Sequence, residues 1–269
     1  MVPDDALFLP LGDHRFEPTE LTRGGWSDDA QHGSPPSGLL ARAVERVSSA
    51  FPMQVVRITM DLFRPVPLSP LDVETVVLRD GRRIQVVEST LLADGVTVGR
   101  ATGLKVRVTE LDLPGATQEW SQPPGPDAAE PVSWEAVLGR PPRTTRFHSA
   151  AIEIRSVANS FLALGPGTSW FRLRYPVVAG EVPTPFVRLA TLADMSNGNS
   201  QRLDPREWLY VNPDITLYLH RLPVSEWIGM RSAAHQHPSG IGLADTTVFD
   251  VDGPIGRINQ AQLIDRRPS

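Results

Sequence analysis

The 269-residue chain contains no cysteine. This absence excludes disulfides, thiolate zinc sites and a cysteine nucleophile, and it fits a reducing compartment. The N-terminus has no basic segment followed by an apolar stretch, and no apolar run approaches the roughly 20 residues of a membrane-spanning helix. These absences together predict a cytoplasmic protein with no membrane span.

Lysine is almost missing from the sequence. Lys105 is one of the 26 basic residues, which leaves 25 arginines against 31 acidic residues and a net charge of -5. Nucleic-acid binders carry a concentrated basic face, so we expect no nucleic-acid partner. The 41% hydrophobic and 21% charged content is typical of a globular protein with a substantial core.

Several well-known functional motifs are also absent. The chain has no G-x-S-x-G nucleophile elbow, no Walker loop and no G-x-G-x-x-G dinucleotide fingerprint. His235 and His237 share a strand face, but no third ligand accompanies them, so we expect neither a metal nor a cofactor.

An internal repeat is the most informative pattern that is present. Residues 58–64 (ITMDLFR) align with 215–221 (ITLYLHR) at an offset of 157, and Gly99-Arg100 aligns with Gly256-Arg257 at the same offset. Two matches at one offset favour a duplicated unit over two unrelated strands. Residues 111–143 between the copies contain seven prolines, which predicts a surface linker outside any sheet, with one helical turn near 134–138.

Each half has a pattern typical of one helix followed by antiparallel strands. Pro35-Pro36 and Thr184-Pro185 are helix-start signals, each followed by an apolar stripe at helical spacing, and Gly198 is a stop signal for the second helix. Alternating segments then predict strands, with Asp-Gly pairs at hairpin turns. The predicted strands are 55–63, 72–78, 83–92 and 96–108 in the first half and 214–221, 227–234, 240–250 and 256–264 in the second.

Three polar residues of the second half are candidates for chemistry. Asp194 lies near the end of its predicted helix beside the apolar stripe, and both the helix dipole and burial would raise its pKa and make it a better base. Thr216 lies on the repeated strand and points away from its two neighbours. Gln262 shares a strand face with Gln260 and would need a hydrogen-bond partner if that face is buried. Each of these residues also has a purely structural interpretation.

The first half contributes a different element, the segment before its helix. N–H groups at a helix N-terminus can bind a carbonyl oxygen or an anion, and Gly33 lets a ligand approach the backbone closely. His32 next to it is a candidate acid or base, or a residue that orients the loop.

These motifs resemble the acyl-CoA thioesterase II family of double-hotdog proteins. The resemblance rests on residues 192–198 (LADMSNG), 212–221 (NPDITLYLHR), 256–262 (GRINQAQ) and 32–41 (HGSPPSGLLA). It implies an α+β fold of two helix-wrapped antiparallel sheets in tandem, with hotdog units at 1–110 and 144–269 joined by the linker 111–143.

The resemblance also implies an activity, the metal-independent hydrolysis of an acyl-CoA thioester. Asp194, Thr216 and Gln262 would hold the hydrolytic water, with Asp194 as general base or as the carboxylate that orients the water. N–H groups around His32 and Gly33 would bind the thioester carbonyl. Two alternatives remain, a non-catalytic acyl-CoA or lipid-binding protein and a double-hotdog dehydratase. Hotdog proteins commonly associate through sheet edges, so a homodimer is compatible with the resemblance.

Overall fold

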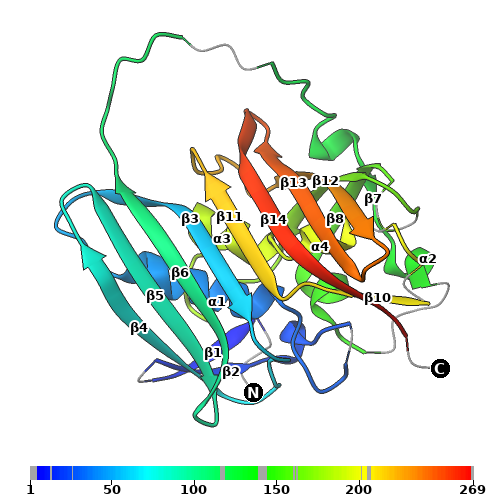
Figure 1. The fold of residues 1–269 in the computed structure, drawn as a ribbon, viewed down its shortest axis with the longest axis horizontal. Coiled ribbons are helices and arrows are strands. Elements are labelled where there is room, and N and C mark those ends of the chain that lie inside the picture. The colour runs from blue at the N-terminus through cyan, green and yellow to red at the C-terminus, as the bar shows by residue number, and fades with distance from the viewer. Residues whose placement is uncertain are drawn as a thin grey trace.

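In the computed structural model, one antiparallel sheet covers two central helices (Figure 1). The structure describes residues 5–12, 14–25, 27–115, 119–138, 144–159, 161, 163–200, 202–204 and 207–267. The Pro141-Pro142 pair of the predicted linker lies outside the described residues.

The two central helices begin where the sequence predicts. Helix α1 (Ser34–Arg46) has Pro35 and Pro36 in its first turn, and Leu39, Leu40 and Val44 of its apolar stripe are fully buried. Helix α3 (Pro185–Leu192) follows the N-cap Thr184, whose hydroxyl accepts a hydrogen bond from the Val187 amide at 3.1 Å. Prolines fit the first helical turn because its N–H groups have no intrahelical partner.

The predicted second helix does not run unbroken to Gly198. Helix α3 ends at Leu192, and a separate short helix, α4 (Met195–Gly198), follows with Asp194 as its N-cap. Asp194 therefore lies at a break between two helices rather than in the last turns of one.

The sheet contains the eight predicted strands and several that the pattern did not reveal. Among the described residues, its strand order is β1-β2-β4-β5-β6-β3-β11-β14-β13-β12-β9-β8-β7, with β10 paired to β14. The predicted strands are β3 (Met53–Leu62), β4 (Leu71–Asp80), β5 (Ile84–Ala93), β6 (Val96–Arg107), β11 (Asp214–Leu219), β12 (Ile228–His237), β13 (Ile241–Asp250) and β14 (Gly253–Arg266). The others are β1 (Phe8–Gly12), β2 (Arg15–Pro18), β7 (Glu130–Pro131), β8 (Ile152–Ala158), β9 (Gly167–Leu173) and β10 (Trp208–Val211).

The internal repeat meets itself at the centre of the sheet. Strands β3 and β11 pair antiparallel with Thr59 opposite Thr216, two residues that are 157 positions apart. Outward from this pair, Gly99 lies opposite Leu62 and Gly256 lies opposite Leu219, again at an offset of 157. The aligned segments thus occupy matching positions on the two sides of the central pair.

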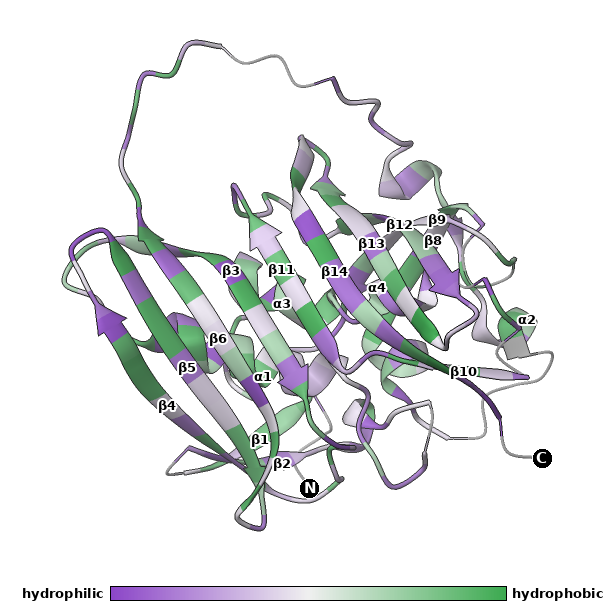
Figure 2. Ribbon diagram, in the orientation of Figure 1, coloured by the Kyte–Doolittle hydropathy of each residue, from purple (hydrophilic) through white to green (hydrophobic). Residues whose placement is uncertain are grey.

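The two faces of the sheet differ in polarity, as the alternating colours along the strands show (Figure 2). On β11, Ile215 and Leu217 are fully buried against the helices, whereas Thr216 between them is only partly buried. Side chains alternate across a strand, so Thr216 lies on the outer face. The inner face and the helices form one core, whose largest fully buried side chains include Phe8, Phe147, Phe171, Phe186, Leu39, Leu40, Ile58 and Met60.

The proline-rich segment is partly built into the second half. The predicted helical turn is confirmed as α2 (Trp134–Leu138). The expectation that no sheet forms here is wrong at β7, whose two residues pair with β8 and form the edge of the sheet. Proline is tolerated at an edge because one side of the strand needs no partner. The Trp170 indole donates to the Pro124 carbonyl at 2.8 Å, which holds the segment on the outer face. In the described part of the chain, no helix is both long and apolar enough to span a bilayer.

Candidate functional site

A buried carboxylate at the break between α3 and α4 gathers polar groups from both halves of the chain. The Asp194 Oδ1 accepts a hydrogen bond from the Asn212 amide at 2.7 Å and one from the Gln260 amide at 3.4 Å. Its Oδ2 lies 2.9 Å from the His32 Nδ1. Asp194 is 7% exposed and His32 16%, so the imidazole is the side of the cluster nearer to solvent.

The pKa of Asp194 moves opposite to the expectation from sequence. Burial raises the pKa of this carboxyl, but the adjacent His32 and the hydrogen bonds from His32, Asn212 and Gln260 outweigh burial, so the pKa lies below its usual value. Donors to a carboxylate stabilise its charged form. Asp194 is therefore a stable anion at neutral pH and a weaker base than predicted.

A chain of amides fixes the orientation of this cluster. Gln262 donates to Asn197 at 2.6 Å, and Asn197 donates to the Asn212 Oδ1 at 3.1 Å. Asn212 in turn donates to Asp194. Gln260 is held from its other end because its Oε1 accepts from the Ser196 hydroxyl at 2.8 Å. The side-chain oxygens of Asn212 and Gln260 each accept from a neighbour, so their N–H groups are directed at the carboxylate. The Gln262 Oε1 is buried without a hydrogen-bond partner among the described residues.

Gly33, at the start of α1, packs directly against the carboxylate. A Cβ placed on Gly33 would lie 2.7 Å from the Asp194 Oδ2 and 3.2 Å from Leu62. Its φ of -62° is ordinary for any residue, so glycine is required here by the close approach and not by the backbone. The N-terminus of α1 in the first half thus meets the acidic residue of the second half.

Few N–H groups are available at this helix start. Pro35 and Pro36 have none, and the Ser37 amide donates to the Gly33 carbonyl at 3.2 Å. The Ser34 amide donates to the His32 Nδ1 at 3.1 Å. Among the described residues, the Gly33 amide is therefore the donor of this turn without a hydrogen-bond partner, and the Ser34 amide is directed at His32.

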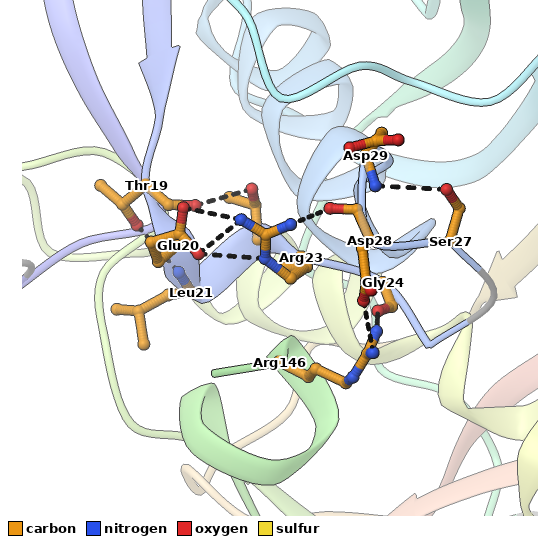
Figure 3. A network of polar contacts seen from close by, with 10 residues as sticks. Thr19, Glu20, Leu21, Arg23, Gly24, Ser27, Asp28, Asp29 and Arg146 are labelled. Atoms are coloured by element: carbon orange, nitrogen blue, oxygen red, sulfur yellow. Dashed lines mark hydrogen bonds and ion pairs between the residues drawn. The ribbon is translucent and has the colours of Figure 1, made fainter. Parts of the chain in front are cut away.

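The loop that carries His32 is tied to the segment after the linker. Arg146 reaches from that segment to the Gly24 carbonyl and, at 2.7 Å, to the Asp28 carboxylate (Figure 3). The Phe147 amide donates to the Arg23 carbonyl at 2.9 Å. The π-helix η3 (Phe147–Ala151) then places Phe147 against the His32 ring, with the ring centroids 5.1 Å apart.

Two of the residues expected to hold water lie elsewhere. The Thr216 hydroxyl donates to Thr59 at 3.3 Å on the outer face of the sheet, away from Asp194, so the structure does not bring Thr216 into the cluster. Gln262 does point inward, but it contacts Asn197, and Gln260 two residues earlier contacts Asp194. Asn212 takes the position beside the carboxylate that was expected of Thr216.

The sequence contained signals for both Asn212 and Gln260. Gln260 and Gln262 share one face by period two, so either of them satisfied the pattern. Asn212 begins the segment 212–221 that resembles the family, immediately before Pro213 and the repeated strand.

The repeat places a different set of side chains at the related position of the first half. At the offset of 157, Gln262 corresponds to Lys105, whose ammonium donates to the Glu45 and Val47 carbonyls at 3.0 and 2.6 Å. Gln260 corresponds to Gly103, where an added Cβ would lie 2.2 Å from Val44. Within the described residues, this position has no counterpart of the amide-ringed carboxylate.

Two clefts, of about 220 and 410 Å³, run along α1 and share Arg42 and Arg46. Neither is lined by Asp194, His32 or Gln260, so the polar cluster is the candidate site on chemical grounds. Among the described residues, no group of three or more His, Asp or Glu side chains is placed to hold a metal ion.

Comparison with known families identifies the family of the chain. The acyl-CoA thioesterase N-terminal domain model matches residues 22–106, and the C-terminal domain model matches residues 119–264. The chain therefore belongs to the acyl-CoA thioesterase family, as the resemblance of its motifs predicted. No curated protein matches the chain by sequence.

Solved structures show the same fold at low sequence identity. A hot dog fold protein of unknown function from Alicyclobacillus acidocaldarius is 16% identical, with a TM-score of 0.73 over 99% of this chain and 98% of the other. The acyl-CoA thioesterase II TesB2 from Mycobacterium marinum is 15% identical, with a TM-score of 0.68 over 97% and 96%. The tesB protein from Mycobacterium avium subsp. paratuberculosis is 18% identical, with a TM-score of 0.64 over 97% and 96%. The hot dog fold class is thus confirmed.

Proposed function

We propose that the cluster around Asp194 hydrolyses acyl-CoA thioesters to a free acid and CoA, in a fold made of two hot dog units in tandem. The observation that carries this proposal is the contact of a buried, amide-ringed carboxylate with the glycine N-terminus of α1. Hydrolysis of a thioester needs an activated water beside a donor for the developing oxyanion. Membership of the acyl-CoA thioesterase family supports the substrate class.

The amides at the start of α1 are the groups we assign to the thioester carbonyl. Gly33 and Ser34 carry the N–H groups at the start of the first turn, because two prolines follow them. The Ser34 amide donates to the His32 Nδ1 and becomes available when Nδ1 carries a proton. Gly33 lacks a side chain that would cover its own amide. The positive end of the helix dipole adds to the stabilisation of an oxyanion there.

Asp194 supplies the negative charge of the site, and Asn212 and Gln260 orient it. Gln262 acts one step further away through Asn197. In this proposal Asn212 and Gln260 replace Thr216 and Gln262 next to the carboxylate.

The test is CoA release from a panel of acyl-CoA thioesters of different chain length, followed with a thiol reagent. We expect the wild type to release CoA, and we expect Asp194→Asn and Gln260→Leu to lose most of that activity. Thr216→Val serves as the control on the outer face and should keep the wild-type rate. Full activity in Asp194→Asn, or loss of activity confined to Thr216→Val, would contradict the assignment.

The dehydratase alternative has one observation in its favour, the His32–Asp194 pair. Such a pair can move a proton to and from the carbon next to a thioester carbonyl. The two reactions separate in one assay, because hydration of an enoyl-CoA removes its conjugated double bond without releasing thiol. A protein that binds acyl-CoA and gains thermal stability, yet changes neither signal, would instead fit the non-catalytic alternative.

A further inference from the structure

Resting on the proposed hydrolysis, we propose that the Nε2 atom of His32 takes the proton from the attacking water and that Asp194 holds the imidazole in place for this step. His32 is then a catalytic residue, and Asp194 is a positioning residue that acts through it. Four features of the cluster lead to this assignment.

The first feature is that both carboxylate oxygens of Asp194 are already engaged. Oδ1 accepts from Asn212 and Gln260, and Oδ2 faces the His32 Nδ1 at 2.9 Å and the backbone of Gly33. A carboxylate with this many donors is stabilised as an anion, and its pKa lies below the usual value. It has little tendency to take up a further proton at neutral pH.

The second feature is the tautomer that this contact selects. If Nδ1 carried no proton, its lone pair would face a carboxylate lone pair across 2.9 Å. A proton on Nδ1 turns this contact into a charge-assisted hydrogen bond. In the neutral ring Nε2 is then the unprotonated nitrogen and a base. The Ser34 amide also donates toward Nδ1 at 3.1 Å, but the contact with the Asp194 carboxylate is shorter and its acceptor is charged, which favours the proton on Nδ1. In that tautomer the Ser34 amide gives up this acceptor and can donate to the thioester carbonyl.

The third feature is the position of the ring. Its side chain is 16% exposed, against 7% for Asp194, so the imidazole lies between the buried anion and solvent. Phe147, which is fully buried, packs against the ring and fixes its plane. Within the described residues, no hydrogen bond engages Nε2.

The fourth feature concerns the other ionisable groups that face His32. The His148 ring lies 6.2 Å away on η3, and burial, together with His32 and Arg146, lowers the pKa of His148 to about 3. Arg146 is paired with Asp28. His148 therefore stays neutral above this pH and adds no positive charge beside His32.

In the proposed step, one water proton passes through His32 to the leaving group. As the water oxygen bonds to the thioester carbon, one water proton passes to Nε2 and the carbonyl electron pair moves onto its oxygen, opposite the Gly33 and Ser34 amides. When this intermediate collapses, the carbon–sulfur bond breaks and the leaving sulfur takes the proton from Nε2. The products are the carboxylic acid and the CoA thiol, and the imidazole is neutral again.

Two substitutions of His32 separate proton transfer from a structural role. His32→Asn keeps an N–H near the position of Nδ1 for Asp194 but has no titratable nitrogen, and His32→Phe removes both. We expect kcat to fall about 10²–10⁴-fold in both variants, with KM changed far less. The matched control is His235→Asn, an exposed histidine on β12, which should keep the wild-type kcat.

The pH dependence of kcat/KM identifies the base. With His32 as the base, the wild-type kcat/KM falls on the acid side as the imidazole takes up a proton, and this limb is absent in His32→Asn. With Asp194 as the base, the limb lies below the usual carboxyl range. NMR of ¹⁵N-labelled histidine adds a readout that does not need turnover, with a protonated Nδ1 and a bare Nε2 expected at neutral pH.

The outcomes distinguish this inference from the proposed function. Wild-type kcat in His32→Asn, with loss in Asp194→Asn, would overturn the role of His32 and leave hydrolysis at this site standing. Loss in His32→Phe alone would show that His32 only donates a hydrogen bond. A wild type that releases no CoA from any thioester, with His32 in the expected tautomer, would overturn the hydrolysis and the catalytic role of His32 with it.

Discussion

Gly33→Ala is the sharpest single perturbation of the site, because the new methyl group points directly at the Asp194 carboxylate. The Cβ would lie 2.7 Å from Oδ2, whereas ordinary van der Waals contact begins at 3.4 Å, so the carboxylate must move by about 0.7 Å. A shift of this size is enough to break the 2.9 Å contact with His32.

The expected cost follows from that geometry. Losing a hydrogen bond to a charged group costs about 1.5–3 kcal/mol. The smaller backbone entropy of alanine in the unfolded chain offsets about 0.4–1 kcal/mol, because φ at Gly33 is already -62°. We therefore expect the free energy of unfolding to fall by about 1–2 kcal/mol and kcat/KM to fall about 100-fold.

Urea denaturation and CoA release measure the two effects on the same preparation. The control is Gly125→Ala, at a φ of -65° with no atom within 4 Å of the added Cβ, and it should leave the rate unchanged. If Gly33→Ala matched Gly125→Ala in both stability and rate, the close packing of Gly33 on Asp194 would not matter and the reasoning would fail.

Three further predictions concern stability. Asn212→Ala removes the 2.7 Å hydrogen bond to Asp194 and should lower the free energy of unfolding, measured by urea denaturation at neutral pH, by about 1.5–3 kcal/mol. The control Asn259→Ala, on the outer face, should change it by less than about 0.5 kcal/mol. Equal losses in the two variants would contradict the hydrogen-bond network. Gly38→Ala puts a Cβ 2.2 Å from the Thr191 hydroxyl between α1 and α3 and should lower the free energy of unfolding by about 1–3 kcal/mol. Adding Thr191→Ala should recover this stability. A Gly38→Ala variant more stable than wild type would refute the tight contact between the helices. Burial raises the pKa of Asp250, but hydrogen bonds from Arg221 and two backbone amides outweigh it and leave the pKa below its usual value. Its stabilisation is therefore present above the usual carboxyl pKa and is lost as pH falls through the lower folded value. Asp250→Asn should be less stable than wild type at neutral pH, and this difference should shrink as the pH falls through the lowered pKa; a difference independent of pH would count against the pair.

Much of the fold could be predicted because local patterns and tertiary packing agree. Pro35-Pro36 and Thr184-Pro185 mark helix starts whose apolar stripes are the ones buried under the sheet. The offset of 157 identified the segments that became the two central strands. The family resemblance followed from these same segments.

The strands and the helix break that the sequence did not predict depend on long-range contacts. Strands β1, β2 and β7 are short and lie near the ends of the sheet, where pairing and not periodicity defines them. The break at Asp194 is not visible in composition, because its neighbours on both sides are good helix formers. The wrong sign for the pKa of Asp194 has the same origin, since the donors that lower it come from distant segments.

Long-range contacts also decide which single residues form the site. Period two places Gln260 and Gln262 on one face, but which of them reaches Asp194 is set by where the helix breaks. Thr216 lies on the strand predicted to carry a water-binding residue, but its side chain lies on the outer face, because Ile215 and Leu217 take the inner positions.

The pairing of β3 with β11 means that the two halves are joined by a continuous backbone ladder as well as by the chain itself. The covalent connection after β6 is exposed, with Leu111 and Leu113 70% and 72% accessible. Proteolytic nicking near Leu113 should therefore leave the molecule assembled. Co-expressed fragments split there should complement one another, and because His32 and Asp194 would then reside on different polypeptides, their activity should rise with fragment concentration.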